Sequence, residues 1–172
     1  MQHDRIDPVL SDWSRERPDL STESLALALR LQSLAKSMAD NLTEVLSRFD
    51  LEWWEYDVLS VLRRQGSPYQ MSASDIGANT RLSGGAVTNR IDGLVDRSFV
   101  ERIADPKDRR RVLVQLLESG QQIVDRATSA RFQNAEHALE CLTDTEQSQL
   151  NSLLRKLVIG NEISLDSSEI SS

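Results

Sequence analysis

The chain has 172 residues, 39% of them hydrophobic, which is enough for one globular domain with extensions. Its formal net charge of -7 excludes a uniformly basic nucleic-acid-binding surface, although a local cluster can still be basic. No segment is long and apolar enough to span a membrane, and the N-terminus lacks the order of a signal peptide, so we expect a cytoplasmic protein with no membrane partner. The single cysteine, Cys141, excludes an internal disulfide and fits a reducing compartment.

The N-terminal extension, residues 1–20, is predicted to contain one short amphipathic helix. Asp7 stands before Pro8, and a capping carboxylate followed by proline in the first turn is typical of a helix start. This helix is expected to end before Pro18.

A much longer helix is predicted over residues 21–50. One of its faces carries an apolar side chain about once per turn, at Leu27, Leu31, Leu34, Met38, Leu42, Val45 and Phe49. Leu25 and Leu29 widen this face beyond what one neighbouring helix would cover. We therefore expect the segment to pack against a second subunit as well as against its own domain.

A third helix is predicted from Asp50 to Gly66, and one of its sides carries polar and aromatic residues. Trp53, Asp57, Ser60 and Arg64 follow one another at spacings of four, three and four residues, so they share that side. Because Asp57 lies within an apolar run, its carboxylate requires a cationic partner.

Two short helices separated by a turn are predicted next. Ser72 stands three residues before Asp75, which is the spacing of a reciprocal N-cap, and Ser83 can cap the second helix. One face of that second helix is apolar, with Val87, Ile91, Leu94 and Val95. The other is small or polar, as a helix that enters a DNA groove requires, with Ser83, Gly84, Gly85, Thr88, Asn89 and Asp92. Together the two helices form a helix-turn-helix.

A basic hairpin is predicted after the helix pair. Residues 99–103 alternate like a strand, Asp105 and Pro106 turn the chain, and residues 112–116 return as the partner strand. The tip carries four cations suited to phosphate or minor-groove contact, Lys107, Arg109, Arg110 and Arg111. Between Arg81 and Arg111 there are eight Lys or Arg against five acids, so this segment has a net charge of +3 and the rest of the chain -10.

Two C-terminal helices are predicted over residues 119–162. The second begins at a capping box from Thr143 to Glu146, carries an apolar face with Leu150, Leu153, Leu154, Leu157 and Val158, and is expected to end at Gly160. Residues 163–172, rich in serine and acid, are expected to be a disordered tail.

The segment LSGGAVTNRIDGLVDRSFVER followed by DPKDRRRVLVQL resembles the winged helix-turn-helix of MarR-type transcription regulators. The wing motif of that family, Asp-x-Arg-Asp-x-Arg, corresponds to residues 105–110, with Lys107 where an arginine is usual. The resemblance implies a mainly α (α+β) fold with a winged helix-turn-helix domain at residues 51–118 between long dimerisation helices. It also implies a homodimer that reads a palindromic operator in double-stranded DNA, through Ser83, Gly84, Gly85, Thr88, Asn89, Lys107, Arg109 and Arg110.

The chain further resembles the urate-responsive branch of that family, the HucR- and PecS-like proteins, which have an added N-terminal helix with a tryptophan. This resemblance implies a small-molecule effector, urate or a related purine or aromatic anion, bound by Trp13, Asp57, Arg64 and Arg90. It also implies a switch ion pair between Asp57 and Arg102. The alternative is structural: Asp57 and Arg102 tie a helix to the wing, and Trp13 pins the extra helix to the body.

No catalytic motif occurs in the sequence, so we expect neither an enzyme nor a cofactor. His137 and Cys141 have the spacing of two metal ligands on a helix, but two ligands do not close a site, and no cation flanks Cys141 to activate its thiol for redox chemistry. The alternative functions are a protein-interaction module that uses the winged helix only as a scaffold and, third, a small enzyme using the Trp-Asp-Arg cluster.

Overall fold

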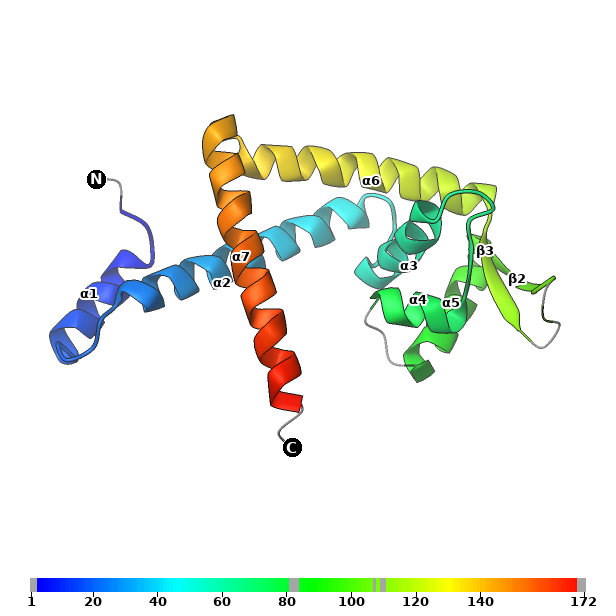
Figure 1. The fold of residues 1–172 in the computed structure, drawn as a ribbon. Coiled ribbons are helices and arrows are strands. Elements are labelled where there is room, and N and C mark those ends of the chain that lie inside the picture. Colours follow the sequence, from blue (N-terminus) through cyan, green and yellow to red (C-terminus); the bar gives the residue numbers. More distant parts are fainter. Residues whose placement is uncertain (1–2, 81–83, 107, 109–110, 170–172) are drawn as a thin grey trace. The chain divides into compact units, whose positions relative to one another are not determined.

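The computed structural model of the chain describes residues 3–80, 84–106, 108 and 111–169. It divides into two compact units, Met1–Phe132 and Gln133–Ser172. The elements before the sixth helix are, in order, α1 (Asp7–Glu16), α2 (Glu23–Ser47), α3 (Trp53–Arg64), β1 (Gln70–Ser72), α4 (Ala73–Thr80), α5 (Gly84–Asp96), β2 (Val100–Ala104) and β3 (Val112–Leu116) (Figure 1). Helix α6 (Glu118–Leu139) begins in the first unit and ends in the second, which also contains α7 (Asp144–Glu169). The predicted fold, mainly helical with a small antiparallel sheet, is confirmed.

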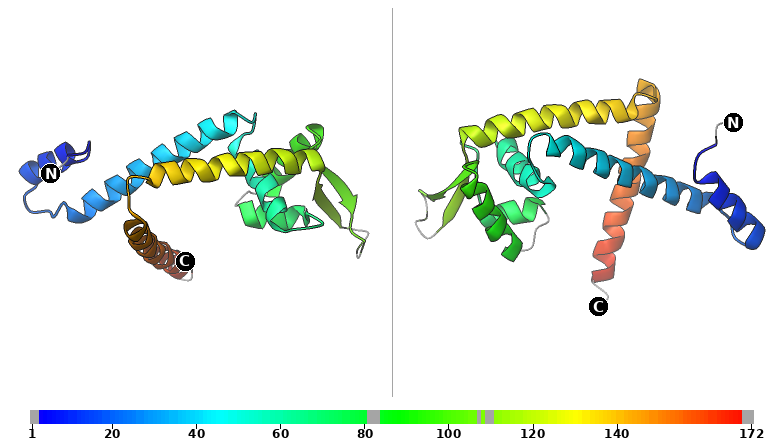
Figure 2. Two further views of the ribbon diagram at one scale, coloured as in Figure 1. Left: turned by 90° about the horizontal axis from the view of Figure 1, so that it is seen from above. Right: turned by 180° about the vertical axis from the view of Figure 1, so that it is seen from behind.

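The three strands form one antiparallel sheet in the order β1-β3-β2. The β2–β3 hairpin is the predicted wing, and its register runs from Val100 opposite Leu116 to Ala104 opposite Val112. Strand β1 was not predicted, because three residues are too few to show an alternating pattern; it pairs with the other edge of β3. Figure 2 shows the wing from two further sides.

The core lies where α3, α4, α5 and the sheet meet. Its fully buried side chains include the predicted inner faces of α3 and α5, at Val58, Leu59, Leu62, Ile91 and Leu94, joined by Leu46, Ile76, Val114 and Val124. Each such side chain stabilises the fold by about 1.5 to 3 kcal/mol relative to exposure. The helix-turn-helix is therefore held by the inner faces of its helices. The outer face of α5 does not take part in the core and is exposed to solvent.

Helix α6 begins in close contact with the chain that enters β2. A Cβ atom at Gly120 would overlap the carbonyl oxygen of Phe99 and lie 2.7 Å from Leu116 Cδ1. The next backbone contact is a hydrogen bond of 2.9 Å from Leu117 N to Phe99 O. Only glycine fits this crossing, which fixes the start of α6 against the wing.

The helix starts are partly as predicted. Ser72 Oγ accepts from Asp75 N at 3.2 Å and caps α4, and Thr143 N donates to Glu146 Oε2 at 2.8 Å before α7, as expected. The predicted cap of α1 is wrong, because Asp7 already lies inside the helix and Asp4 accepts from Ile6 N at 2.8 Å.

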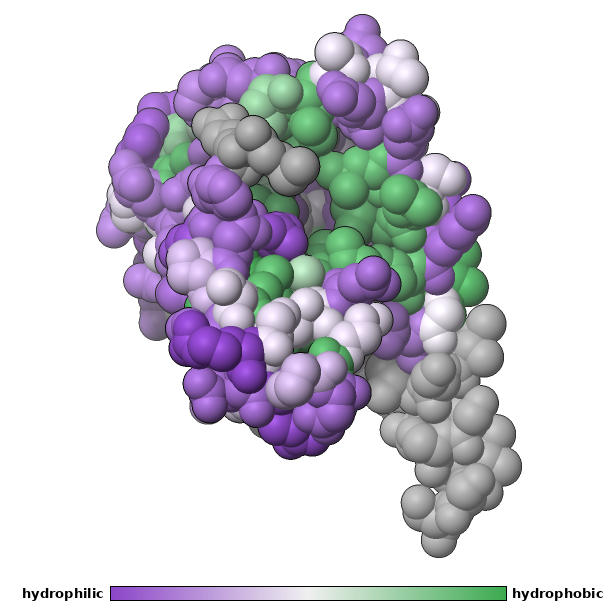
Figure 3. Space-filling view, turned by 90° about the vertical axis from the view of Figure 1, so that its left-hand side faces the viewer, coloured by the Kyte–Doolittle hydropathy of each residue, from purple (hydrophilic) through white to green (hydrophobic). Residues whose placement is uncertain are grey.

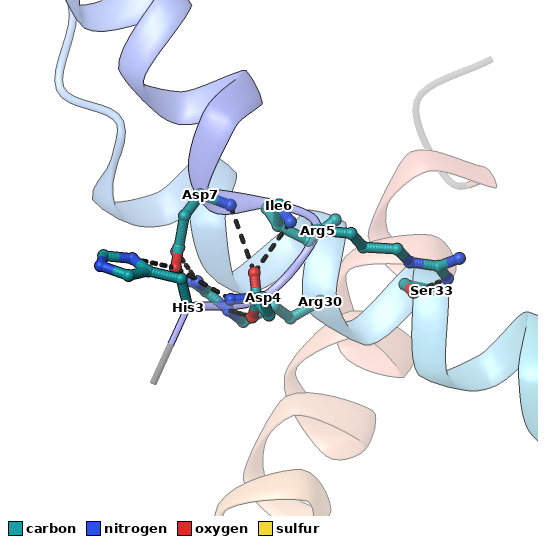
Figure 4. A network of polar contacts seen from close by, with 7 residues as sticks. All are labelled: His3, Asp4, Arg5, Ile6, Asp7, Arg30 and Ser33. Carbon is teal, nitrogen blue, oxygen red and sulfur yellow. Dashed lines mark hydrogen bonds and ion pairs between the residues drawn. The ribbon is translucent and has the colours of Figure 1, made fainter. Parts of the chain in front are cut away.

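Helix α1 is tied to α2 by a polar network around Arg30 (Figure 4). Arg30 Nε donates to Asp4 Oδ2 at 2.7 Å, and its Nη2 donates to Asp7 Oδ1 at 2.5 Å. Arg5 also donates to Ser33 Oγ. Because these groups are largely exposed, each ion pair contributes little, and the network orients α1 more than it stabilises the fold.

The predicted end of α7 is wrong, because the helix continues through Gly160 to Glu169. The disordered tail at residues 163–172 stays a prediction. A glycine inside a helix costs only about 1 kcal/mol relative to alanine, so a single glycine need not end a helix. Within the described residues, no helix is long and apolar enough to cross a membrane.

Candidate nucleic-acid interface and effector cavity

The outer face of α5 is the face predicted to enter the DNA groove, so α5 is called the reading helix below. Thr88 and Asn89 are exposed, while Val87 and Ile91 on the same helix are buried. Gly84 and Gly85 form its first turn. The predicted cap Ser83 lies outside the described residues. The helix therefore exposes short polar side chains and holds its apolar face in the core.

The wing hairpin closes through backbone bonds at its tip. Asp105 N donates to Arg111 O at 3.0 Å, and Arg111 N donates to Asp108 O at 2.9 Å. Three of the predicted DNA contacts, Lys107, Arg109 and Arg110, lie outside the described residues. Arg111 is described and its side chain is exposed.

The predicted switch pair between Asp57 and Arg102 is not formed in this structure. Arg102 Nη2 instead contacts Asp92 Oδ1 at 2.8 Å, which links β2 to the second half of α5. The reason is positional: Arg102 lies on β2 within reach of Asp92 of α5, whereas Asp57 lines the cavity between α3 and α6. The wing is thus tied to the reading helix itself.

A cavity of about 460 Å³ lies between α3 and α6. Helix α3 contributes the whole predicted polar and aromatic stripe to it, as well as two residues between, and its lining residues are Trp53, Tyr56, Asp57, Ser60, Arg63 and Arg64. Helix α6 contributes Asp125, Thr128, Arg131 and Phe132, which no sequence pattern had pointed out.

The charges in this cavity are unevenly paired. Arg63 makes a two-pronged contact with Asp125, Nε to Oδ1 at 2.9 Å and Nη2 to Oδ2 at 3.2 Å. Burial raises the pKa of Asp57 above its ordinary value, while the nearby charges of Arg64 and Arg131 act in the opposite direction. Asp57 therefore has cationic neighbours, as its place in an apolar run requires, but they come from α3 and α6.

The four predicted effector ligands do not all meet in this cavity. Asp57 and Arg64 line it. Arg90 lies over the ring of Trp54 at 5.4 Å and binds α5 to the opposite side of α3. Trp13 is on α1, half exposed, and is absent from the cavity wall in the single chain. The aromatic wall is provided by Trp53 and Tyr56, whose ring centres lie 6.1 Å apart.

A buried carboxylate that sequence reasoning missed holds α3 to the end of α5. Glu55 is 4% exposed, and Arg97 Nη1 donates to both of its oxygens at 2.8 Å. The other nitrogen, Arg97 Nη2, donates to Asp50 O at 2.7 Å. Glu55 stands one residue before the buried Tyr56, and a carboxylate inside a buried run could have predicted a partner, although not which arginine. The pair fixes the reading helix relative to the helix that lines the cavity.

Comparisons with known proteins agree with this architecture. The sequence model of the MarR family matches residues 49–111. The transcriptional regulator PecS of Dickeya dadantii is 28% identical over 152 residues, which cover 88% of this chain and 92% of PecS. The uncharacterized HTH-type transcriptional regulator YkoM of Bacillus subtilis is 33% identical over 108 residues, 63% of this chain and 68% of YkoM.

A solved structure adds a comparison in three dimensions. A cysteine-to-serine mutant of Escherichia coli MarR in complex with operator DNA is 26% identical to this chain and superposes with a TM-score of 0.66. The match covers 79% of this chain and 96% of that one.

Proposed function

The chain belongs to the MarR family of winged-helix transcriptional regulators, and on that premise we propose that it represses transcription by binding an inverted-repeat operator as a homodimer. In this proposal a small aromatic anion such as urate enters the cavity between α3 and α6 and releases the DNA. The observation that carries the proposal is the outer face of α5, which is polar and exposed, and which lies in a segment, residues 81–111, with a net charge of +3.

DNA binding is supported by the distribution of charge. The acidic remainder of the chain disfavours non-specific attachment to DNA, while the cations of residues 81–111 are available for phosphates. The related E. coli MarR has been solved on operator DNA, with a similar fold. Thr88 and Asn89 of α5 are the described side chains placed to reach base edges.

A homodimer is supported by apolar side chains that the single chain leaves in solvent (Figure 3). Leu27 and Leu34 on α2 are 67% and 61% exposed, and Leu153 on α7 is 58% exposed. Faces of this kind are rarely left open in a monomer. A two-fold dimer would place two reading helices about 34 Å apart, one turn of DNA, and so read an inverted repeat.

An aromatic anion is supported by the residues of the cavity. Trp53 and Tyr56 offer ring faces, Arg64 offers a cation, and Asp57 can accept a hydrogen bond from a ring N-H. Urate combines a flat ring, a negative charge and N-H donors.

The test is binding to duplexes selected from a random library, followed by fluorescence anisotropy at several salt concentrations. The parent protein is expected to select an inverted repeat, and Arg110→Ala is expected to flatten the slope of log affinity against log salt by about one. Selection of no sequence, with no salt-dependent binding, would refute the proposal and favour a protein-interaction module.

A further inference from the structure

The cavity between α3 and α6 contains a cation that the predicted effector ligands do not include. The guanidinium carbon of Arg131 lies 5.4 Å from the ring centre of Trp53 and 5.3 Å from that of Tyr56. Arg131 is half-buried on α6, and it faces Asp57 and Arg64 across the cavity. Arg131 therefore lines the cavity beside its two aromatic rings.

The three arginines of the cavity differ in what they already bind. Arg63 is committed to Asp125 by two hydrogen bonds. Arg64 donates from Nε to Ser60 O of its own helix at 3.2 Å. Among the described contacts, Arg131 has ring partners but no ion pair with a carboxylate. Its N-H edges are therefore available to a ligand, while its flat face is held by the two rings.

The charge balance of the cavity selects the charge of the ligand. Arg63 and Asp125 neutralise each other, which leaves Arg64 and Arg131 opposite the single carboxylate of Asp57. A monoanion completes this balance, whereas a neutral ligand leaves one partly desolvated cation uncompensated. A guanidinium that stacks on rings can still bind an anion in its own plane, which a lysine ammonium does poorly.

We propose that Arg131 binds the anionic edge of the effector and makes this cavity selective for planar aromatic monoanions over neutral analogues of the same shape. The inference rests on the proposed effector function. It adds that Arg131 binds the effector and that the cavity prefers anionic ligands to neutral ones. Because Arg131 lies on α6, the effector would connect α3 to α6, the helix that follows the wing. Helix α3 in turn holds the end of α5 through the ion pair of Glu55 with Arg97.

The experiment is titration calorimetry of the full-length protein with urate, with salicylate, and with hypoxanthine as a neutral purine. The variants are Arg131→Met, which removes the charge at similar length, and Arg131→Lys, which keeps the charge. The control is Arg126→Met on the same helix, since Arg126 also lies over a ring, Phe49 at 5.5 Å, but does not line the cavity. Thermal unfolding checks that each variant is folded.

The parent is expected to bind an aromatic anion more tightly than hypoxanthine. Arg131→Met should weaken the binding of the anion about 10- to 150-fold, the effect of losing a charge-assisted hydrogen bond. It should leave the affinity for hypoxanthine nearly unchanged. Arg131→Lys should be intermediate, and Arg126→Met should match the parent.

Two results would overturn the inference in different ways. If the parent binds the anion and Arg131→Met binds it equally well, or loses both ligands alike, then Arg131 does not select the anion although the effector function stands. If the folded parent binds neither urate nor salicylate, the effector function fails and this inference fails with it.

Discussion

Asp57 is the residue whose environment departs most from what the sequence indicated. Its predicted partner Arg102 forms an ion pair with Asp92 instead. The carboxylate of Asp57 is half-buried, and its cationic neighbours are Arg64 and Arg131. Burial raises its pKa above the ordinary value, so the folded protein holds this proton more tightly than the unfolded chain does. Linkage then requires the free energy of unfolding to fall as the pH rises through the titration of Asp57.

Asp57→Asn should remove this pH dependence. The variant is expected to gain stability relative to the parent between about pH 4 and neutral pH, with no difference in more acidic solution. Urea unfolding across a pH series measures it. Asp4→Asn is the contrast, because a hydrogen bond from Arg30 lowers the pKa of Asp4, so that variant should lose stability at neutral pH and match the parent in acid. Parallel pH profiles for the parent and Asp57→Asn would contradict the assignment.

The ion pair of Arg102 with Asp92 predicts a different result for DNA binding. Arg102→Ala should weaken operator affinity up to about fivefold, since it loosens the wing from α5 and leaves a carboxylate uncompensated on the reading helix. Asp57→Asn should leave DNA affinity unchanged in the absence of effector. Anisotropy with one duplex and both variants decides the matter; weaker binding by Asp57→Asn alone would restore the predicted Asp57–Arg102 switch.

At the scale of elements, helix α3 shows what sequence periodicity can and cannot give. The spacing of Trp53, Asp57, Ser60 and Arg64 predicts a shared face, and all four line one cavity. The other wall comes from α6, and contacts between residues so distant in the chain leave no periodic signal. For the same reason Arg97 could not be assigned to Glu55 from the sequence, although a buried acid requires a cation.

The other elements show the same difference between features fixed by local interactions and features fixed by contacts between distant residues. The caps at Ser72 and Thr143 depend on residues three apart, and local hydrogen bonding is enough to predict them. Strand β1 exists because it pairs with β3, and three residues carry no pattern of their own. Gly160 predicts the end of α7, but the helix continues beyond it, because a single glycine does not break a helix that is otherwise formed. The predicted DNA contacts at the wing tip remain predictions.

Gly120→Ala tests how closely α6 crosses the chain before β2. The added methyl group would overlap the carbonyl oxygen of Phe99, so backbone must move, and we expect a loss of about 1 to 3 kcal/mol in the free energy of unfolding. Gly93→Ala is the matched control on α5, where the new Cβ would lie 3.6 Å from the ring of Trp54, an ordinary contact. Urea denaturation of both variants measures the difference; equal stability would show that the crossing is loose.

At the scale of the whole molecule, the proposed homodimer would be formed by the apolar faces of α2 and α7. A dimer that buries them should depend on single large side chains. Leu153→Asp, at a position 58% exposed in the single chain, is expected to yield monomer or aggregate, because it places a charge in an apolar interface. Ser152→Asp, one residue away and exposed, is the control and should stay dimeric. Light scattering during size exclusion reports the mass; a dimer of unchanged stability with Leu153→Asp would exclude α7 from the interface.

The proposed mechanism requires that effector and DNA oppose each other through one protein. A ligand that prefers the DNA-free conformation by about 1 to 3 kcal/mol weakens DNA binding by roughly 5- to 150-fold at saturation. By reciprocity, bound DNA must lower the affinity of the protein for the effector by the same factor. The contacts of α3 with Arg90 of α5 and with Arg97, which directly follows α5, would be the physical route for this coupling.

The most direct measurement is the anisotropy of a selected inverted-repeat duplex, titrated with the parent protein over a range of salt, with and without saturating urate. We expect log affinity to fall linearly with log salt, with a slope set by the number of phosphate contacts. We also expect urate to weaken binding at each salt concentration by the same factor, between roughly 5- and 150-fold. Binding that ignores salt would contradict the DNA-binding account, and salt-dependent binding that urate leaves unchanged would contradict the effector account.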